Sequence, residues 1–304
     1  MKKLLIVTAL IALLCSTLLL SGCVMDFLRD NAKDKDGNYR IYSIRIYQET
    51  PAWELAKAVR DQNTNKIAKI GKTQPELLNY QDPLYGATLL YWAVGVEKYK
   101  SAEALLKAGV DPDIICIDYG ETPLFRAAGY SLVDNSAKKD PKYVKLLLQY
   151  GADPNIGHTG KPWEEIGTTP LMNSIGCGIE KTKALVEGGA DINYQTVTGY
   201  TATYKALRWG IEYAYYLIVE KKADVTIPYC INMVDGSVNT VYPVTLLRGW
   251  LYELDSKEYL RKMEVVAECA RQGQDYWSTE IPSSSLEQIK KLYPNSWEEY
   301  IKRY

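Results

Sequence analysis

Four apolar runs that end in a similar polar phrase dominate the middle of the chain. The strongest copies are LLLQYGADPN at 146–155 and LVEGGADIN at 185–193, and looser copies lie at 105–113 (LLKAGVDPD) and 217–225 (LIVEKKADV). A motif that returns about every 30 to 40 residues is typical of a repeated structural unit rather than of one active site. The pattern therefore predicts a stack of similar units, each containing an apolar segment that packs on its neighbours.

A second phrase, Gly-x-Thr followed by an apolar stretch, opens each unit. It reads GATLLYWAV at 86–94, GETPLFRAA at 120–128, GTTPLMNSI at 167–175 and GYTATYKAL at 199–207. Thr is a favourable helix N-cap and Pro is tolerated at the first helical position, so each phrase predicts the start of a short first helix. The Gly after the second apolar run predicts a left-handed helix end, and the Asp-x-Asn that follows predicts a turn.

These phrases resemble the ankyrin repeat over most of residues 50–230. The resemblance implies an all-α fold, an ankyrin-repeat solenoid of about five to six helix-turn-helix units. Residues 50–70 share the two-helix pattern and predict an opening repeat. Residues 242–270 predict a last helix pair without the Gly-Ala-Asp ending, as expected for a terminal repeat that faces water. We assign 45–273 to the repeat domain and 274–304 to a C-terminal helical tail.

Two units carry insertions. SLVDNSAKKDP at 131–141 lengthens the link between the two helices of one repeat, and GHTGKPWEE at 157–165 lengthens the next finger loop. Insertions in repeat proteins lie in loops and often on the working face. A tolerated loop without function is an equally good interpretation.

The first 22 residues predict an export signal. Two lysines precede an apolar run at 4–20, and small residues follow it. The segment ends in LSGC at 20–23, which closely resembles the bacterial lipobox. The resemblance implies that Cys23 becomes the first mature residue, carrying a diacylglycerol on its thiol and usually a further acyl chain on the new amino group. The alternative is an ordinary signal peptide, 1–22, with an incidental cysteine.

Residues 23–44 follow as the lipidated cysteine and a solvated tether that includes RDNAKDKDGN at 29–38. No later stretch approaches the roughly 20 apolar residues needed to cross a bilayer. We therefore expect the lipid to be the only membrane attachment. Val24 stands where the resemblance would put Asp in lipoproteins kept at the inner membrane of many Gram-negative bacteria. This favours the outer membrane, with the protein facing the periplasm.

Composition narrows the class of protein. The chain has 304 residues, 47% of them hydrophobic and 24% charged, with a formal net charge of −1. These values exclude a chain that is disordered by composition and a polycation that binds nucleic acid. Tyr occurs 25 times and Trp seven times, against two Phe. Because Tyr and Trp are frequent anchors of protein interfaces, this bias favours a protein-binding surface.

Residues for catalysis or metal binding are scarce. His158 is the one histidine, so the chain has no histidine pair for a metal, and its Gly-flanked loop predicts a solvated side chain. The stretch Gly176-Cys177-Gly178 lacks the third glycine of a dinucleotide-binding turn. We expect no catalytic residues, no metal and no cofactor.

Four cysteines follow the lipobox cysteine. They are Cys116, Cys177, Cys230 and Cys269. In an oxidising compartment they could form two disulfides. The repeat register places them in a finger, a turn, a loop and a second helix, which are not equivalent positions. Such positions are poorly suited to bring two sulfur atoms together, so we favour free thiols and leave the disulfide alternative open.

The resemblance to ankyrin repeats implies which positions contact a partner. In that family the fingertip loops, just before the repeat Gly, and the ends of the first helices form the binding face. Carried over to this chain, these positions, the residue after the repeat Gly and the inserted finger give Tyr85, Asp118, Tyr119, Glu121, Tyr130, Trp163, Glu165, Tyr200, Arg208 and Trp209. We predict that the six aromatic residues form a track across the repeats, with the four charged residues beside it. The alternative is that several of these rings only pad contacts between repeats.

We therefore expect a non-enzymatic protein-binding lipoprotein of the bacterial envelope that is a monomer when free and binds no nucleic acid. Its architecture is similar to that of ankyrin-type immunity lipoproteins, which bind and neutralise a toxin delivered to the periplasm, such as a type VI secretion phospholipase effector. This similarity carries no specific motif. The alternatives are a scaffold or chaperone for a resident envelope protein, and an enzyme or small-ligand receptor with a pocket at the long insertion.

Overall fold

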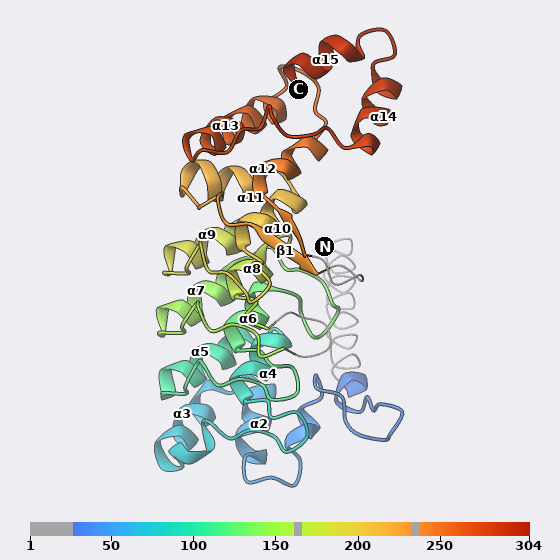
Figure 1. Cartoon of the computed structure of the whole chain (residues 1–304). Helices are drawn as coiled ribbons and strands as arrows, with labels where there is room; N and C mark the ends of the chain where they lie inside the picture. The colour runs from blue at the N-terminus through green and yellow to red at the C-terminus, as the bar shows by residue number, and fades with distance from the viewer. Residues whose placement is uncertain (1–26, 161–165, 233–237) are drawn as a thin grey trace, which may run out of the picture. The chain divides into compact units, whose positions relative to one another are not determined.

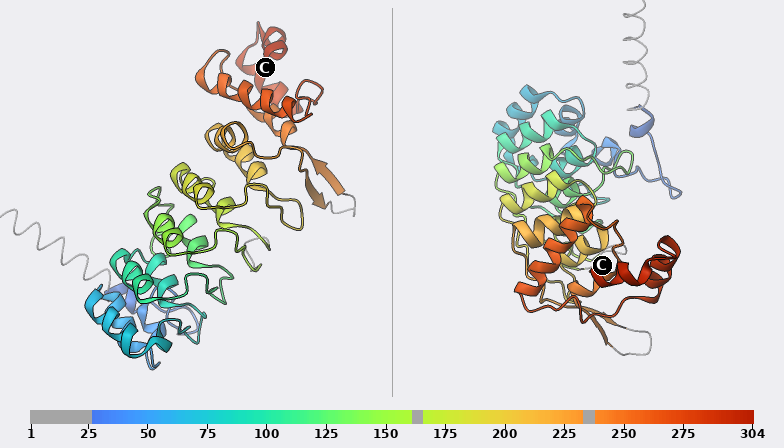
Figure 2. Two further views of the ribbon diagram at one scale, coloured as in Figure 1. Left: turned by 90° about the vertical axis from the view of Figure 1, so that its left-hand side faces the viewer. Right: turned by 90° about the horizontal axis from the view of Figure 1, so that it is seen from above.

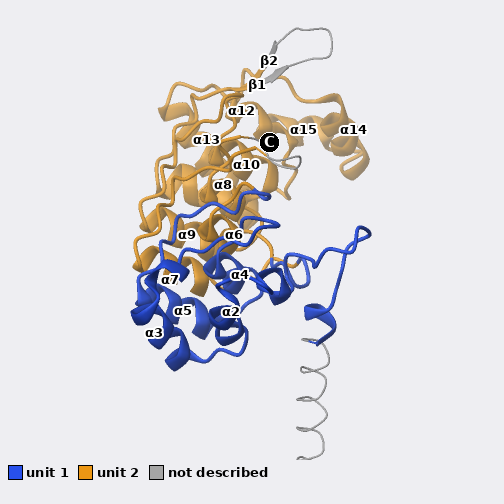
Figure 3. Ribbon diagram, turned by 90° about the horizontal axis from the view of Figure 1, so that it is seen from below, with its two compact units in different colours: residues 1–119, 131–135 blue, residues 120–130, 136–304 orange. Residues whose placement is uncertain are grey.

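The computed structural model of the chain describes residues 27–160, 166–232 and 238–304. The chain divides into two compact units (Figure 3). Unit 1 comprises residues 1–119 and 131–135, and unit 2 comprises residues 120–130 and 136–304. Both units are built mainly from helices, so the predicted all-α class is confirmed.

Unit 1 consists of two helix pairs with short 3-10 helices around the first. Its elements are η1 (Ile44–Tyr47), α2 (Trp53–Arg60), α3 (Thr64–Thr73), η2 (Pro75–Leu77), α4 (Leu89–Gly95) and α5 (Tyr99–Ala108). Helix α2 packs on α4, and α3 packs on α5 (Figure 1). The sequence 50–70 thus forms the helix pair that its pattern predicts. All seven residues of α4 are buried, so this helix is the centre of the unit.

The segment before α2 packs on this unit. Ile41 lies against Tyr91 and Cys116 in an apolar cluster, and Ile44 is fully buried. Ser43 caps η1, and its hydroxyl donates to the Asp30 carbonyl over 2.6 Å. The prediction of a solvated tether that continues to residue 44 is therefore wrong for residues 41–44. Their apolar side chains gain burial against a helix that lies far along the chain.

Within its described residues, unit 2 contains four first helices and four second helices. The first helices are α6 (Pro123–Ala128), α8 (Pro170–Ser174), α10 (Ala202–Trp209) and α12 (Pro243–Leu246), with α12 continuing as the 3-10 helix η4 (Leu247–Gly249). The second helices are α7 (Lys142–Gln149), α9 (Ile179–Glu187), α11 (Ile211–Ala214) and α13 (Lys257–Arg271), with α11 continuing as the π-helical segment η3 (Tyr215–Glu220). Within unit 2 the first helices pack in one row and the second helices in another (Figure 2).

A short antiparallel hairpin lies between η3 and α12. Strand β1 (Tyr229–Asn232) pairs with β2 (Val238–Val241), with Tyr229 opposite Val241. The expectation that Cys230 lies in a loop is wrong, because Cys230 belongs to β1. The aromatic and β-branched residues of these segments favour an extended, paired backbone.

The capping chemistry that the sequence predicts is present in all four central repeats. A threonine side chain accepts a hydrogen bond from the backbone N–H three residues later at Thr88, Thr122, Thr169 and Thr201. After the second helices, Gly109, Gly151 and Gly189 adopt φ angles of 94°, 87° and 93°. Lys222 holds the equivalent position in the fourth repeat with a φ of 58°. A residue with a Cβ thus takes the left-handed conformation there, which usually costs about 1 kcal/mol.

The predicted C-terminal tail is helical and packs on the last repeat. It contains α14 (Ser283–Leu292) and α15 (Trp297–Arg303). Ile289, Tyr300 and Tyr304 form an apolar cluster, against which Leu251 and Leu254 of the η4–α13 link pack.

Two buried cations lie at the base of this tail. The Arg248 guanidinium donates to the main-chain oxygens of Tyr276 and Tyr304, each over 3.0 Å. The Lys262 ammonium donates to the Trp250 carbonyl over 2.9 Å and lies 3.9 Å from the centre of the Tyr304 ring. Carbonyl oxygens and aromatic faces compensate for the water that these charges lose on burial.

Three cysteine thiols are described, and none of the three is in a disulfide. Cys116, Cys177 and Cys269 are all buried. In the part of the chain that the structure describes, no helix is both long enough and apolar enough to cross a bilayer.

Candidate functional site

The first finger of unit 1 is held in shape by Asp82. This buried carboxylate accepts hydrogen bonds from the backbone N–H groups of Leu84, Tyr85 and Ala87 over 2.7 to 2.9 Å. Burial raises the Asp82 pKa, although these hydrogen bonds oppose the shift. The Gln81 side chain also donates to the Gly86 and Ile115 carbonyls and ties this finger to the next one. The fingertip is therefore preorganised.

Two predicted site residues of unit 1, Tyr85 and Tyr119, do come together. Their ring centres are 6.4 Å apart, and Tyr119 also lies 6.5 Å from the buried Tyr91. The Tyr85 hydroxyl donates to the Tyr39 carbonyl over 3.0 Å, and burial raises the Tyr85 pKa to about 12. Both rings are half-buried, so each ring packs within the unit and also exposes part of its surface to solvent. Asp118, beside them, is exposed.

Every central finger exposes an aliphatic side chain close to its repeat Gly. These residues are Leu84 and Ile117 in unit 1, and Ile166 and Val197 in unit 2. Val197 is 86% exposed, the highest value among the large hydrophobic residues described. The repeat register already places Leu84, Ile166 and Val197 just before a repeat Gly, but the predicted site residues are their aromatic and charged neighbours. The signal that could have found them is an aliphatic residue one to three positions before each repeat Gly.

In unit 2 the predicted residues at the helix ends meet around one turn. Tyr130 and Trp209 are 42% and 57% exposed. The Tyr130 hydroxyl hydrogen-bonds the Cys177 sulfur. The Trp209 ring lies on Gly176, so close that a Cβ built there would be 2.5 Å from it. Residues from three successive repeats thus form one connected surface.

Arg208 and Tyr200 lie beside this surface. The Arg208 guanidinium is exposed, 5.9 Å from the centre of the Tyr204 ring. Tyr200 and Tyr204 pack with Tyr229 of β1, at centroid distances of 4.3 to 5.5 Å. Tyr200 therefore helps to hold the hairpin in place and is only half-exposed.

Glu121 has a supporting position. Its side chain is buried, with 5% of its surface exposed, and it forms an ion pair with Arg126. Arg126 also donates to the Tyr130 carbonyl over 3.1 Å. Contrary to the role that the sequence suggests, Glu121 faces its own unit and orients the segment that carries Tyr130. The predicted site residues Trp163 and Glu165 lie outside the described residues.

The interpretation of His158 as a solvated side chain is wrong. Only 5% of its surface is exposed, and its ring centre lies 5.3 Å from that of Phe125. Its Nδ1 atom accepts a hydrogen bond from the Gly160 N–H over 3.0 Å. The backbone of His158 also exchanges hydrogen bonds with Gly167 and Thr168 over 2.8 Å. His158 thus pairs with residues 167–168 through its backbone, and its ring is buried against Phe125.

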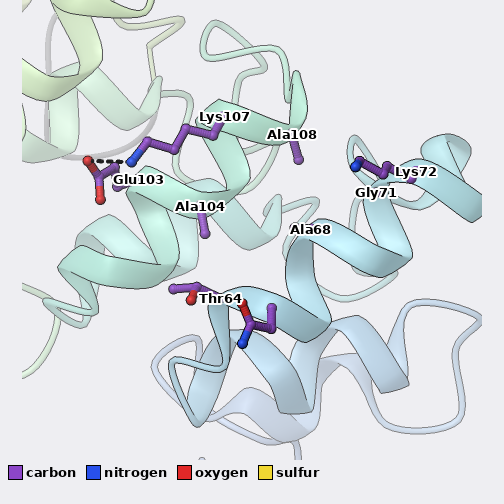
Figure 4. A pocket seen from close by; sticks show the side chains of 9 residues that line it. Thr64, Ala68, Gly71, Lys72, Glu103, Ala104, Lys107 and Ala108 are labelled. Carbon is purple, nitrogen blue, oxygen red and sulfur yellow. Dashed lines mark ion pairs between the residues drawn. The ribbon is translucent and has the colours of Figure 1, made fainter.

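A cavity of about 560 Å³ in unit 1 lies on the second helices rather than at the fingers (Figure 4). It is lined by Thr64, Asn65, Ala68, Gly71, Lys72, Glu103, Ala104, Lys107 and Ala108. Its only acidic side chain, Glu103, pairs with Lys107 over 2.9 Å. Small residues on α3 and α5 create this space, which is a gap between two adjacent helices.

A smaller hollow of about 240 Å³ in unit 1 includes part of the long insertion. Val133 lines it together with Leu28, Arg29, Ala32 and Tyr42. No group of three or more His, Cys, Asp or Glu side chains suited to a metal occurs among the described residues.

Comparison with known families identifies the repeat. Residues 135–229 match the family model described as ankyrin repeats, in three copies. The chain therefore contains ankyrin repeats within an all-α fold. Such repeats are protein–protein interaction modules and are typically not enzymes. The comparison with curated proteins gave no match.

Proposed function

We propose that this protein is a lipid-anchored ankyrin-repeat protein of the bacterial envelope that binds another protein through its fingertips and the ends of its first helices. The observation that carries the binding role is the exposure of an aliphatic side chain at the fingertip of successive repeats. These residues are Leu84 and Ile117 in unit 1, and Ile166 and Val197 in unit 2. The exposed Trp209, at the end of the first helix α10, adds an aromatic side chain. Exposed aromatic and aliphatic side chains on a rigid scaffold are the usual anchors of a protein interface.

The envelope location rests on the N-terminal sequence. The lipobox-like LSGC predicts lipidation at Cys23. Each buried methylene of an acyl chain contributes about 0.8 kcal/mol to membrane binding, so several chains would hold the protein at the bilayer surface. The outer membrane, facing the periplasm, is the location that Val24 favours. The binding face would then meet proteins that enter or reside in the periplasm.

Within this role, we favour an immunity protein that neutralises a periplasm-targeted toxin, such as a type VI secretion phospholipase effector. The combination of a proposed lipid anchor with an interaction module supports this role by its architecture alone. A scaffold or chaperone for a resident envelope protein is the alternative. A toxin gene next to the gene for this protein would favour immunity, and a neighbouring gene for envelope assembly would favour the scaffold.

Affinity capture from detergent-solubilised envelope extracts, with and without the candidate toxin, tests this proposal. The full chain should retain one specific protein, and Ile166→Asp with Val197→Asp should abolish retention while preserving the circular dichroism spectrum. Leu260→Asp is the matched control, because Leu260 is an exposed aliphatic residue on the second helix α13. Equal loss in the control, or retention by the double variant, would show that the fingertips are not the binding site.

A growth experiment separates immunity from the scaffold role. Cells that lack the protein should die when the neighbouring toxin reaches the periplasm, and the wild-type chain should rescue them. The Ile166→Asp, Val197→Asp variant should not rescue. Survival without the protein, together with an envelope assembly defect, would favour the scaffold instead.

A further inference from the structure

Two consecutive residues near the N-terminal end of unit 1, Phe27 and Leu28, are large, apolar and exposed. Phe27 is 66% exposed and Leu28 is 57% exposed. Residues 27–30 form a single helical turn, which the Asn31 side chain closes by donating to the Phe27 carbonyl over 2.8 Å. Leu28 also lines the hollow of about 240 Å³ that Val133 borders. Contact of this pair with an apolar phase would be favourable, because it removes their side chains from water.

The segment that follows this turn is fastened to unit 1. The Asp30 carbonyl accepts a hydrogen bond from the Ser43 hydroxyl, and the Asp30 carboxylate lies 3.7 Å from the Arg60 guanidinium of α2. The Tyr39 carbonyl accepts a hydrogen bond from the Tyr85 hydroxyl of the first finger over 3.0 Å. The exposed pair therefore has a defined place on unit 1 and does not belong to a loose tether.

The same segment gives unit 1 a distinct face. Residues 27–47 lie on the other side of the unit from the second helices α3 and α5 (Figures 1 and 3). We define the N-terminal face as the exposed pair together with the other residues that surround the hollow. Its members are Phe27, Leu28, Arg29, Ala32, Tyr42 and Val133.

The charge around this face is nearly balanced. Residues 27–47 contain five basic and three acidic residues. Among the acidic residues, Asp30 faces Arg60, and Asp34 accepts hydrogen bonds from the backbone N–H groups of Asp36 and Asn38, each over 2.9 Å. Asp36 itself is exposed. The apolar side chains, rather than a surplus of one charge, therefore decide what this face can contact.

The proposed lipid attachment brings a bilayer to this face. Phe27 follows Cys23 by four residues, and an extended chain of four residues spans at most about 14 Å. The headgroup layer on each side of a bilayer is about 5 to 8 Å thick. A chain that carries acyl groups on Cys23 thus places Phe27 within this layer or just above it.

We infer that the N-terminal face lies on the lipid bilayer, where Phe27 and Leu28 insert between the headgroups and orient unit 1. The inference rests on the proposed lipid anchor and specifies how the anchored protein meets the membrane. Phe and Leu are among the side chains that interfacial segments bury at this depth. Two side chains alone bind a membrane weakly, so the acyl chains attach the protein and the N-terminal face sets its orientation. The first finger, which Tyr85 joins to the same segment, is thereby held near the membrane surface.

A second copy of the chain fits this face less well than lipid does. A stable interface between two proteins takes about 800 Å² from each partner. The N-terminal face offers two exposed apolar side chains and one small hollow. Insertion into a bilayer needs no complementary surface, since lipid adapts to the shape of the side chains.

Photo-cross-linking in vesicles tests the inference. The full lipidated chain, reconstituted in phosphatidylcholine vesicles, carries benzoylphenylalanine in place of either Val133 or Lys72. Val133 borders the hollow, whereas Lys72 is exposed on α3 at the opposite side of unit 1. Both positions are distant from Cys23 in the sequence, so proximity to the anchor along the chain does not favour either probe. The probe at position 133 should cross-link to lipid about fivefold or more often than the probe at position 72.

Substitution of the exposed pair tests its role. Phe27→Ser with Leu28→Ser should lower lipid cross-linking from position 133 about fivefold, while fatty acid remains on Cys23. Leu260→Ser with Leu292→Ser is the matched control, because both leucines are exposed and lie outside unit 1. The control should leave the cross-linking unchanged. Circular dichroism should show that both variants are folded.

Four outcomes would overturn the inference. The first is equal lipid cross-linking from positions 133 and 72, which would mean that unit 1 has no preferred orientation. The second is cross-linking that survives the substitution of Phe27 and Leu28. The third is cross-linking of one protein chain to another in place of lipid, which would indicate self-association. The fourth is lipid cross-linking only in vesicles that contain phosphatidylglycerol, which would indicate attraction by charge rather than insertion.

Labelling with a radioactive fatty acid keeps the proposed anchor separate from this inference. If the wild type incorporates no fatty acid at Cys23, the anchor fails and the inference fails with it. If the wild type is labelled but positions 133 and 72 cross-link equally, the anchor stands and only the orientation on the membrane is wrong.

Discussion

The ammonium group of Lys262 lies between the rings of Tyr276 and Tyr304, at 5.2 and 3.9 Å from their centres. Burial, together with the charge of Arg248, lowers the Lys262 pKa to about 7, from an ordinary value of about 10.4. Between these two pH values the unfolded chain holds a proton that the folded chain has released. Stability therefore rises with pH in this window.

Replacing Lys262 with Met should remove this pH dependence. The variant keeps an unbranched side chain of similar length but has no group to titrate. Urea denaturation midpoints should show that the variant is more stable than the wild type. This difference in stability should be largest at pH 7 and below, and it should shrink toward pH 9. Lys290→Met, at an exposed position of α14, is the control and should show little pH dependence. A difference between Lys262→Met and the wild type that stays constant with pH would contradict the assignment.

Two of the residues that sequence reasoning misplaced share one property. His158 and Glu121 are polar residues in loop contexts, where exposure is the ordinary expectation. His158 packs against Phe125, which lies elsewhere in the sequence, whereas Glu121 forms an ion pair with the nearby Arg126. Tertiary packing decides whether such a polar side chain is covered, and a single sequence carries no signal for that packing.

At the scale of elements, local chemistry made the helix boundaries predictable. A threonine cap and a glycine in the left-handed conformation act within a few residues, so the sequence itself reports them. The link between α6 and α7 is different. Its contact with Gly178 joins the Lys139 backbone to a turn 39 residues later, and no periodic pattern encodes that contact. The positions of the fingertip residues followed from the repeat register, whereas the contact of the Trp209 ring with Gly176 required the structure.

Burial within the repeats predicts the cost of truncating their side chains. Leu147 of α7 is fully buried, so Leu147→Ala should reduce the free energy of unfolding by about 2 to 5 kcal/mol. Val197→Ala, at an exposed fingertip, should change it by about 0.5 kcal/mol or less. Chemical denaturation of the two variants checks the order. Comparable losses would mean that Val197 packs within the unit, and that the repeat register of the fingertips needs revision.

At the scale of the whole molecule, we propose that the membrane anchor and the partner-binding residues lie in separate parts of the chain. Cys23→Ala should abolish lipidation, because the thiol is the acceptor of the proposed diacylglycerol. Metabolic labelling with a radioactive fatty acid measures this, and the variant should leave the membrane fraction. Its partner binding should be unchanged, since the binding residues all lie beyond residue 80. Label that still enters the Cys23→Ala chain would contradict the lipobox assignment.

The packing of α14 and α15 on the η4–α13 link has a consequence for assembly. A stack of repeats presents an apolar surface at an uncovered end, and two such ends can pair, so that the surface is buried in a dimer. Here Ile289, Tyr300 and Tyr304 cover Leu251 and Leu254. Deleting residues 283–304 should expose these leucines, and light scattering should then show particles that grow with protein concentration. A deletion variant that scatters as a single particle at all concentrations would show that another segment protects this end. Helices α14 and α15 thus close the C-terminal end of the stack, and the proposed partner-binding surface lies on the sides of the repeats.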